Sequence, residues 1–130
     1  MTLLDTSAWI QLFKDKSLIG TQLRNISVCP PVIQEVLQGV RQSPRYEFVE
    51  KGLLSLPCLS KNLEIDRFLE AAEIYRIGRR KGVTIRSPFD CLIGAIAIHH
   101  DTPVVHVDRD FSEIEKFTAL RTIEFDELFN

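Results

Sequence analysis

The chain has 130 residues, of which 45% are hydrophobic and 26% are charged, and its formal net charge is −2. This length is typical of one domain with its own core, and the small net charge excludes a partner that is held by bulk positive charge. Three cysteines without a CxxC pair indicate reduced thiols in a cytoplasmic protein rather than a zinc ribbon or a disulfide framework, and no apolar run reaches the ~18 residues needed to span a membrane.

The start of the chain predicts a strand, an acid and a helix in direct succession. Residues 1–5 form a short apolar run that ends at Asp5. Residues 6–13 have helical apolar spacing, with Thr6 or Ser7 as the expected N-cap. The chain continues with a short helix at 17–24, a strand at 26–31 and a helix at 31–40 whose first turn suits Pro30 and Pro31. A helix at 43–56 follows, with Ser43 as cap and Pro44 at its first position.

The longest periodic segment, residues 62–82, predicts a helix that stops at Gly82. Its inward face is expected to consist of Ile65, Phe68, Leu69, Ala72 and Ile74. Residues 87–100 are apolar on nearly every face and predict a buried helix. They are followed by a strand at 103–107, a loop or short helix at 110–117 and a last strand at 120–125.

Helical patterns separate nearly every pair of predicted strands, which indicates an α/β fold. We expect one domain over residues 1–130, with three α/β/α layers and a central, mostly parallel sheet. Ligands of such sheets bind at the carboxyl ends of the strands. If the strands that end at Asp5 and Asp108 are parallel neighbours, the two carboxylates emerge side by side. Close carboxylates repel each other unless a cation lies between them, and oxygen ligands suit Mg²⁺ or Mn²⁺, so these acids predict half of a metal site.

Asp90 and Glu35 are candidates to complete this site. Gly94 and Ala97 share the helix face of Asp90, and their small side chains would let a strand lie close beside the acid. Asp90 also fits a capping box with Ser87, which would be a structural role alone. Glu35 lies off the apolar stripe of its helix, and periodicity does not distinguish it from other glutamates.

Simpler structural roles remain open for several polar residues. Asp5 could be a strand-end turn residue, and Asp108 or Asp110 could form an Asx-turn. His106 alternates with valines, which predicts a packed histidine rather than a zinc ligand. The one dense basic cluster, consisting of Arg76, Arg79, Arg80, Lys81 and Arg86, would either offset a helix dipole or contact the phosphates of a polyanion.

Four segments occur along the chain in a characteristic order: LLDTSAWI, PPVIQEVLQG, SPFDCLIGAIAIHH and VVHVDRDFSEI. Together they resemble the PIN-domain ribonucleases, and more closely the VapC-type toxins of toxin–antitoxin pairs. The resemblance covers essentially the whole chain. The first and last segments are specific for the family when they occur together. The second segment, which contains Glu35, is a weak indicator by itself.

The resemblance implies a PIN-like domain with Mg²⁺- or Mn²⁺-dependent endoribonuclease activity, acting as a cytoplasmic toxin. The metal-binding and catalytic acids of the family match Asp5, Glu35, Asp90 and Asp108, with Asp110 as a further acid and Thr6 as an auxiliary residue. The basic residues expected to contact RNA are Arg79, Arg80 and Arg86. Expected partners are a small antitoxin and a second copy of the chain, and no membrane. On the residues alone, another magnesium-dependent phosphohydrolase or a non-catalytic module with an acidic pocket stays open.

Overall fold

A computed structural model describes residues 1–15, 24–41 and 44–129. Its centre is a four-stranded sheet in which every neighbouring pair is parallel, in the order β2-β1-β3-β4. The strands are β1 (Thr2–Leu4), β2 (Ile26–Ser27), β3 (Val104–His106) and β4 (Thr122–Glu124). The predicted parallel sheet is therefore confirmed.

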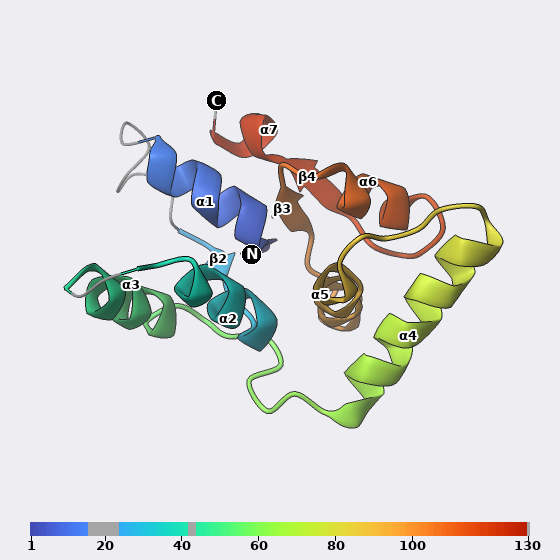
Figure 1. The fold of residues 1–130 in the computed structure, drawn as a ribbon, viewed down its shortest axis with the longest axis horizontal. Helices are drawn as coiled ribbons and strands as arrows, with labels where there is room; N and C mark the ends of the chain where they lie inside the picture. Colours follow the sequence, from blue (N-terminus) through green and yellow to red (C-terminus); the bar gives the residue numbers. More distant parts are fainter. Residues whose placement is uncertain (16–23, 42–43, 130) are drawn as a thin grey trace.

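Helices flank this sheet in the predicted three-layer arrangement. They are α1 (Thr6–Lys14), α2 (Pro30–Gln38), α3 (Arg45–Leu54), α4 (Ile65–Arg80), α5 (Pro88–His99), α6 (Arg109–Glu115) and α7 (Phe125–Phe129). Helices α1 and α7 lie on one side of the sheet and α5 and α6 on the other, with α4 outside α5 (Figure 1). Among the described residues, no helix combines the length and apolar character needed to cross a bilayer.

The strand order reverses between β1 and β3, and this reversal positions the site. Strand β1 continues into α1, whereas β3 continues into α6 on the opposite side of the sheet (Figure 1). The two strands pair directly, with Leu3 opposite Val104 and Leu4 opposite Val105. In open α/β sheets, a crevice forms where the connections diverge in this way, outside the carboxyl ends of the strands.

The central strands are apolar because both faces of the sheet are covered. Leu3, Leu4, Val104 and Val105 are all fully buried. Helix α5 is buried along most of its length, as its sequence predicts. The core therefore fixes the positions at which β1 and β3 end.

The cysteines largely follow the prediction of reduced, buried thiols. All three are free, and Cys29 and Cys91 lie in the core. Cys58 is only half-buried, and it forms an isolated parallel bridge with Val28 next to β2.

The predicted inward face of α4 is wrong in four of its five residues. Ile65, Phe68 and Leu69 are 45–70% exposed, Ala72 is exposed too, and only Ile74 is buried. The buried stripe instead consists of Arg67, Ala71, Ile74 and Gly78. Small residues on that stripe let α4 approach its neighbours: a Cβ at position 78 would lie 3.1 Å from the Val83 carbonyl oxygen and 3.2 Å from Phe117 Cζ. Close packing thus prevails over the larger apolar side chains on the other stripe.

Several predicted helix boundaries differ from the structure. The N-cap of α1 is Asp5, not Thr6 or Ser7, because the Asp5 side chain accepts a hydrogen bond from a backbone N–H of the first turn. Pro44 is the N-cap of α3 rather than its first residue. The helix predicted at 17–24 and the cap predicted at Ser43 fall almost entirely outside the described residues.

Helix α7 has no counterpart in the sequence-based expectations, which end in a strand at residue 125. Five residues are too few to reveal helical periodicity. Two aromatic residues one turn apart, Phe125 and Phe129, hold it to the core with ring centroids 4.6 Å apart. Tertiary packing, not local propensity, therefore forms this helix.

The end of α4 provides a test of the backbone geometry. Gly82 has φ +81°, a left-handed conformation that disfavours any side chain, and Val83 N donates to the Gly78 carbonyl oxygen at 2.8 Å. Gly82→Ala should reduce the free energy of unfolding by about 1 kcal/mol. Gly52→Ala, within α3 and with nothing near the added Cβ, should instead increase it by about 0.5–1 kcal/mol. Urea denaturation measures both, and two changes of the same sign would contradict this account.

Candidate metal centre

Asp5 and Asp108 emerge at the same edge of the sheet, as the sequence predicts. Strands β1 and β3 remain paired up to this edge, since Asp5 N donates to the Val105 carbonyl oxygen at 3.1 Å. Asp5 caps α1 by accepting from Ala8 N at 2.9 Å, and Asp108 caps α6 by accepting from Asp110 N at 3.1 Å. The turn and capping roles that the sequence left open are therefore real, and they fix both carboxylates at the crevice.

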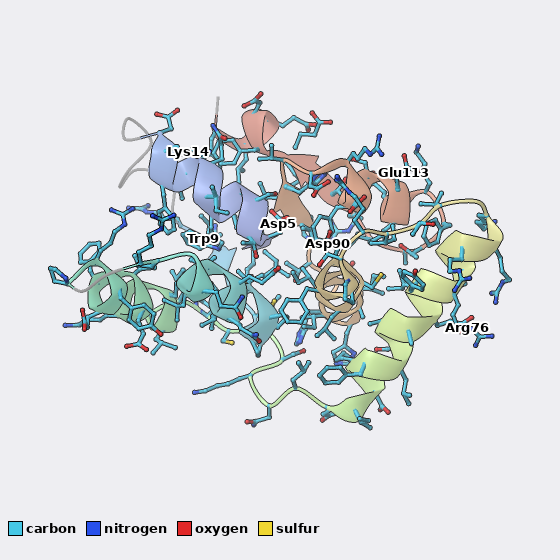
Figure 2. The ribbon with its side chains drawn as sticks, viewed as in Figure 1. Asp5, Trp9, Lys14, Arg76, Asp90 and Glu113 are labelled. Atoms are coloured by element: carbon cyan, nitrogen blue, oxygen red, sulfur yellow. The ribbon has the colours of Figure 1, made fainter. Side chains whose placement is uncertain are left out.

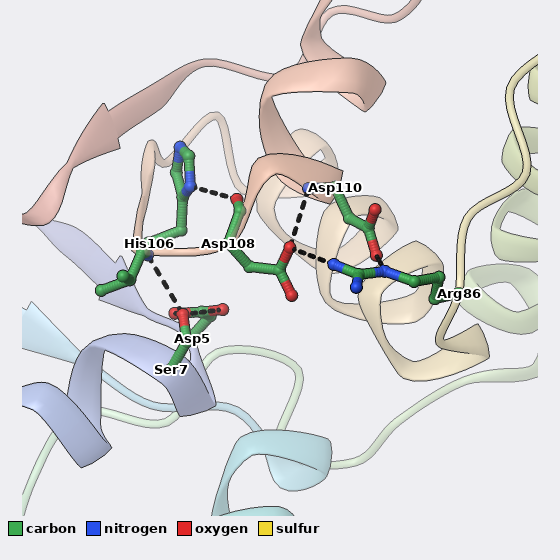
Figure 3. Close-up of polar contacts among 7 residues, drawn as sticks. Asp5, Ser7, Arg86, His106, Asp108 and Asp110 are labelled. Carbon is green, nitrogen blue, oxygen red and sulfur yellow. Dashed lines mark hydrogen bonds and ion pairs between the residues drawn. The ribbon is translucent and has the colours of Figure 1, made fainter.

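Ser7 joins the ends of the two strands. Its hydroxyl lies 2.8 and 2.9 Å from the two carboxylate oxygens of Asp5, to which it donates, and it accepts from Val107 N at 3.1 Å (Figure 3). The backbone after β3 and the first acid are thus connected through one side chain. A serine at this position fixes the orientation of the Asp5 carboxylate.

Thr6 performs a similar task for Glu35, which comes from α2. The Thr6 hydroxyl donates to Glu35 Oε1 at 2.8 Å, across a sequence separation of 29 residues. Glu35 is half-buried in this position. The hydrophobic periodicity of α2 did not distinguish Glu35 from other glutamates. The feature that distinguishes it is the hydrogen bond from the Thr6 hydroxyl in α1.

Asp90 lies in the first turn of α5, and Figure 2 shows it beside Asp5 between α1 and α5. The predicted capping box is absent, since the Ser87 side chain makes no capping hydrogen bond. Gly94 does not face a strand as expected; a Cβ there would contact Ile114 and Ile74 of neighbouring helices.

Carboxylate oxygens of three acids lie within 4.8 Å of one another: those of Asp90, Asp108 and Asp110. Asp110, which the sequence ranks as a secondary member, is thus in the tightest part of the cluster. Asp5 and Glu35 lie around this group and remain predicted ligands.

Asp90 is the electrostatic centre of these acids. Its pKa is raised from 3.8 to about 8, first by burial and then by the negative charges of Asp5, Asp108, Asp110 and Glu35, in that order. All the other acids that the sequence selects therefore act on Asp90 and disfavour its ionisation. Such crowding is costly unless a cation offsets it.

Burial also raises the pKa of Asp5, from 3.8 to about 6. The hydrogen bonds from Ala8 and Ser7 oppose this rise by stabilising the charged form. Asp5 and Asp90 are thus held in a site that disfavours their own ionisation. Oxygen-only donors with crowded negative charge fit a hard divalent cation such as Mg²⁺ or Mn²⁺.

His106 supports the backbone beside the acids. Its Nδ1 lies 2.6 Å from the Asp108 carbonyl oxygen, and since a carbonyl oxygen can only accept, Nδ1 carries the proton (Figure 3). The ring is buried, with its centroid 5.8 Å from that of Phe111. The predicted packed role is confirmed, and the bond to Asp108 is one that strand alternation could not reveal.

Comparison with known proteins identifies the family. The PIN domain family model matches residues 2–117. The chain is 37% identical over 134 residues to the VapC ribonuclease Mb1587 of Mycobacterium bovis, and equally to the ribonuclease VapC11 of Mycobacterium tuberculosis; each match covers 96% of this chain and 99% of the relative. The chain belongs to the PIN-domain family.

Solved structures share the fold of this PIN domain. A DNA-bound VapBC complex from Salmonella typhimurium contains a chain with TM-score 0.73 and 22% identity, covering 96% of this chain and 99% of that one. VapBC-5 from Mycobacterium tuberculosis gives TM-score 0.69 and 17% identity, covering 95% and 97%. At these identities the likeness concerns the fold alone.

The basic cluster of the PIN domain divides into separate groups. Arg76 and Arg80 pair with Glu73 at 3.5 and 3.4 Å, and the guanidinium of Arg79 lies 5.9 Å from the centroid of the Tyr75 ring. Arg86 lies apart from them and pairs with the site acids. The first group makes its contacts within α4, and the RNA contact expected of Arg79 and Arg80 stays a prediction, whereas Arg86 is bound to the acidic cluster.

The raised pKa of Asp90 predicts a pH-dependent stability. Asp90 binds its proton more tightly in the folded than in the unfolded state. The free energy of unfolding therefore includes a stabilising contribution that is fully present below pH ~4 and is lost as the pH rises through about 8. Without divalent cations, Asp90→Asn should therefore raise the Tm relative to the parent by about 3–6 °C at pH 8.5 and by much less at pH 5.

Thermal melts in EDTA measure this difference. Asp66→Asn is the matched control, because Asp66 also occupies the first turn of a helix, α4, but is exposed. An Asp90→Asn protein that melts at or below the parent temperature at pH 8.5 would contradict the electrostatic account.

Proposed function

We propose that this PIN domain is a metal-dependent endoribonuclease and the toxin of a toxin–antitoxin module. The observation that carries the proposal is the convergence of Asp90, Asp108 and Asp110 at the carboxyl ends of paired parallel strands. Two relatives that are 37% identical to this chain over nearly their full length are ribonucleases, which supports RNA as the substrate. Two alternatives, another phosphohydrolase and a non-catalytic module, lack comparable support.

The residues that would hold Mg²⁺ or Mn²⁺ are Asp5, Asp90 and Asp108, with Glu35 and Asp110 completing the site. The negative charges of the other four disfavour ionisation of Asp90, as its raised pKa indicates. A divalent cation held by these residues would offset this effect and favour the charged form of Asp90. The fit of a divalent cation to this site thus rests on the negative charge and the oxygen donors of the five carboxylates.

The chain's own side chains orient the acids for this task. Ser7 and Ala8 N hold the Asp5 carboxylate, Thr6 holds Glu35, and His106 anchors the backbone at Asp108. A bound ion of this class stabilises charge on a phosphate and makes water a better nucleophile at neutral pH. No side-chain nucleophile is required, since water can attack the phosphodiester directly.

Removal of single acids tests the site. Asp5→Asn, Glu35→Gln, Asp90→Asn and Asp108→Asn should each reduce RNA cleavage by ~100-fold or more, because the remaining carboxylates cannot hold and orient the cation as well. Asn can still cap α1 and α6, so the first and last changes preserve the local fold. Asp110→Asn should have a milder effect.

The measurement is the rate of cleavage of total RNA at fixed Mg²⁺, with circular dichroism as a check of folding. Asp66→Asn should cleave like the parent, and chelation should stop the parent. A folded Asp5→Asn protein with full activity, or full activity after exhaustive chelation, would contradict the metal-site proposal.

An antitoxin partner is supported by structural neighbours that are themselves VapBC toxin–antitoxin complexes. Trp9 and Leu12 are core residues of α1, each 4% exposed. They form part of a cavity of about 330 Å³ between α1 and α3, with Phe48 81% exposed at its rim. This apolar cavity is a candidate surface for the antitoxin.

The outward apolar stripe of α4 is a candidate surface for the second copy in a homodimer. Ile65 and Leu69 are 70% and 63% exposed there. Exposed apolar side chains that gather on one helix face favour a protein contact.

Co-expression tests the toxin assignment. Expression of the chain alone in a bacterial host should arrest growth, and co-expression of the adjacent small open reading frame, or Asp5→Asn, should restore growth. An RNA-cleaving protein needs an external inhibitor to be tolerated in a cell. A chain that is harmless alone and is bound by no neighbouring product would contradict the toxin role, while leaving the nuclease role to the cleavage assay.

A further inference from the structure

Arg86 lies across the mouth of the acidic cluster. Its Nη2 is 2.9 Å from Asp108 Oδ1 and its Nε is 3.5 Å from Asp110 Oδ2 (Figure 3). The guanidinium therefore contacts two of the three converging acids, and the third is Asp90. Within the described residues, no other lysine or arginine forms an ion pair with these three acids.

Arg86 supplies positive charge to two of the carboxylates that are proposed to hold the metal. Asp108 Oδ1 already accepts from Asp110 N at 3.1 Å, so the guanidinium takes the remaining capacity of that oxygen. A divalent cation that binds the same carboxylates meets both this competition and the repulsion of a positive charge. Arginine and metal are therefore expected to exclude each other at Asp108 and Asp110.

The contact is suited to exchange rather than to permanent structure. The Arg86 side chain is 65% exposed, and exposed ion pairs contribute little net stability. The backbone, in contrast, is held in place, because Ile85 is buried and Ser87 begins α5 as its N-cap. A released guanidinium would stay at the rim of the site.

We propose that Arg86 is an internal counter-ion that a divalent cation displaces, and that the displaced guanidinium then contacts the phosphate of the bound RNA. This inference rests on the metal site of the proposed function. Arginine donates in a fork that matches phosphate as well as carboxylate, so one side chain can serve both partners in turn. Metal loading and substrate binding become coupled through Arg86.

A direct test is the ¹⁵N–¹H NMR signal of Arg86 Nε during a Mg²⁺ titration without RNA. The signal should begin at the position of an ion-paired guanidinium and move to that of a free one as the metal saturates. Arg86→Gln assigns the signal. A signal that does not move at saturating Mg²⁺ would overturn the displacement.

Metal affinity gives a second readout that does not depend on activity. By isothermal titration, Arg86→Gln should bind Mg²⁺ about fivefold more tightly than the parent. Arg109→Gln is the matched control, since Arg109 lies between Asp108 and Asp110 in sequence but forms no ion pair with them; its effect should stay below about twofold. Equal effects of the two variants would overturn the specific role of Arg86.

The same substitution should strengthen Mg²⁺ binding but weaken the binding of RNA. At saturating Mg²⁺, Arg86→Gln should raise the KM for RNA by about tenfold, whereas Arg86→Lys, which retains the charge, should raise it less. An unchanged KM would overturn the phosphate contact. A parent protein that neither binds Mg²⁺ nor cleaves RNA would contradict the proposed function itself, whereas an active parent with an unresponsive Arg86 would contradict only this inference.

Discussion

The pairing of β1 with β3 is the constraint on which the rest of the structure depends. Both strands are buried on two faces and run parallel, so their carboxyl ends must reach the same edge of the sheet. The chain places Asp5 and Asp108 at those ends and leads away from them in opposite directions. The core thus brings like charges together at a crevice, and the proposed cation would offset their repulsion.

The same acids serve local structure and the proposed chemistry. Asp5 and Asp108 accept backbone hydrogen bonds as helix caps, which fixes their carboxylates without a separate scaffold. Asp90 has no such role, and its pKa is raised the most among the acids of the site. Arg86 offsets part of this charge from the solvent side. Crowded carboxylates of this kind are costly by themselves, and binding of the proposed ion would stabilise the folded protein.

The sequence predicts those features that follow from strand and helix patterns. An apolar run that ends in aspartate correctly placed Asp5 and Asp108, because parallel topology determines where strand ends lie. The inward face of α4 could not be predicted, since close packing at Gly78 outweighs side-chain hydrophobicity. The hydrogen bond from Thr6 to Glu35 could not be predicted for another reason. It joins two helices, and the hydrophobic periodicity within one helix carries no information about such a contact.

The central claim is that the converging acids hold a divalent cation. Crystals grown with Mn²⁺ and measured near the manganese absorption edge test this directly, because anomalous scattering locates the ion without assumptions about function. The account predicts a strong anomalous peak among the carboxylates of Asp90, Asp108 and Asp110, with the Arg86 guanidinium moved away from them. A well-ordered crystal with no peak there, or with Arg86 still paired and the ion elsewhere, would contradict it.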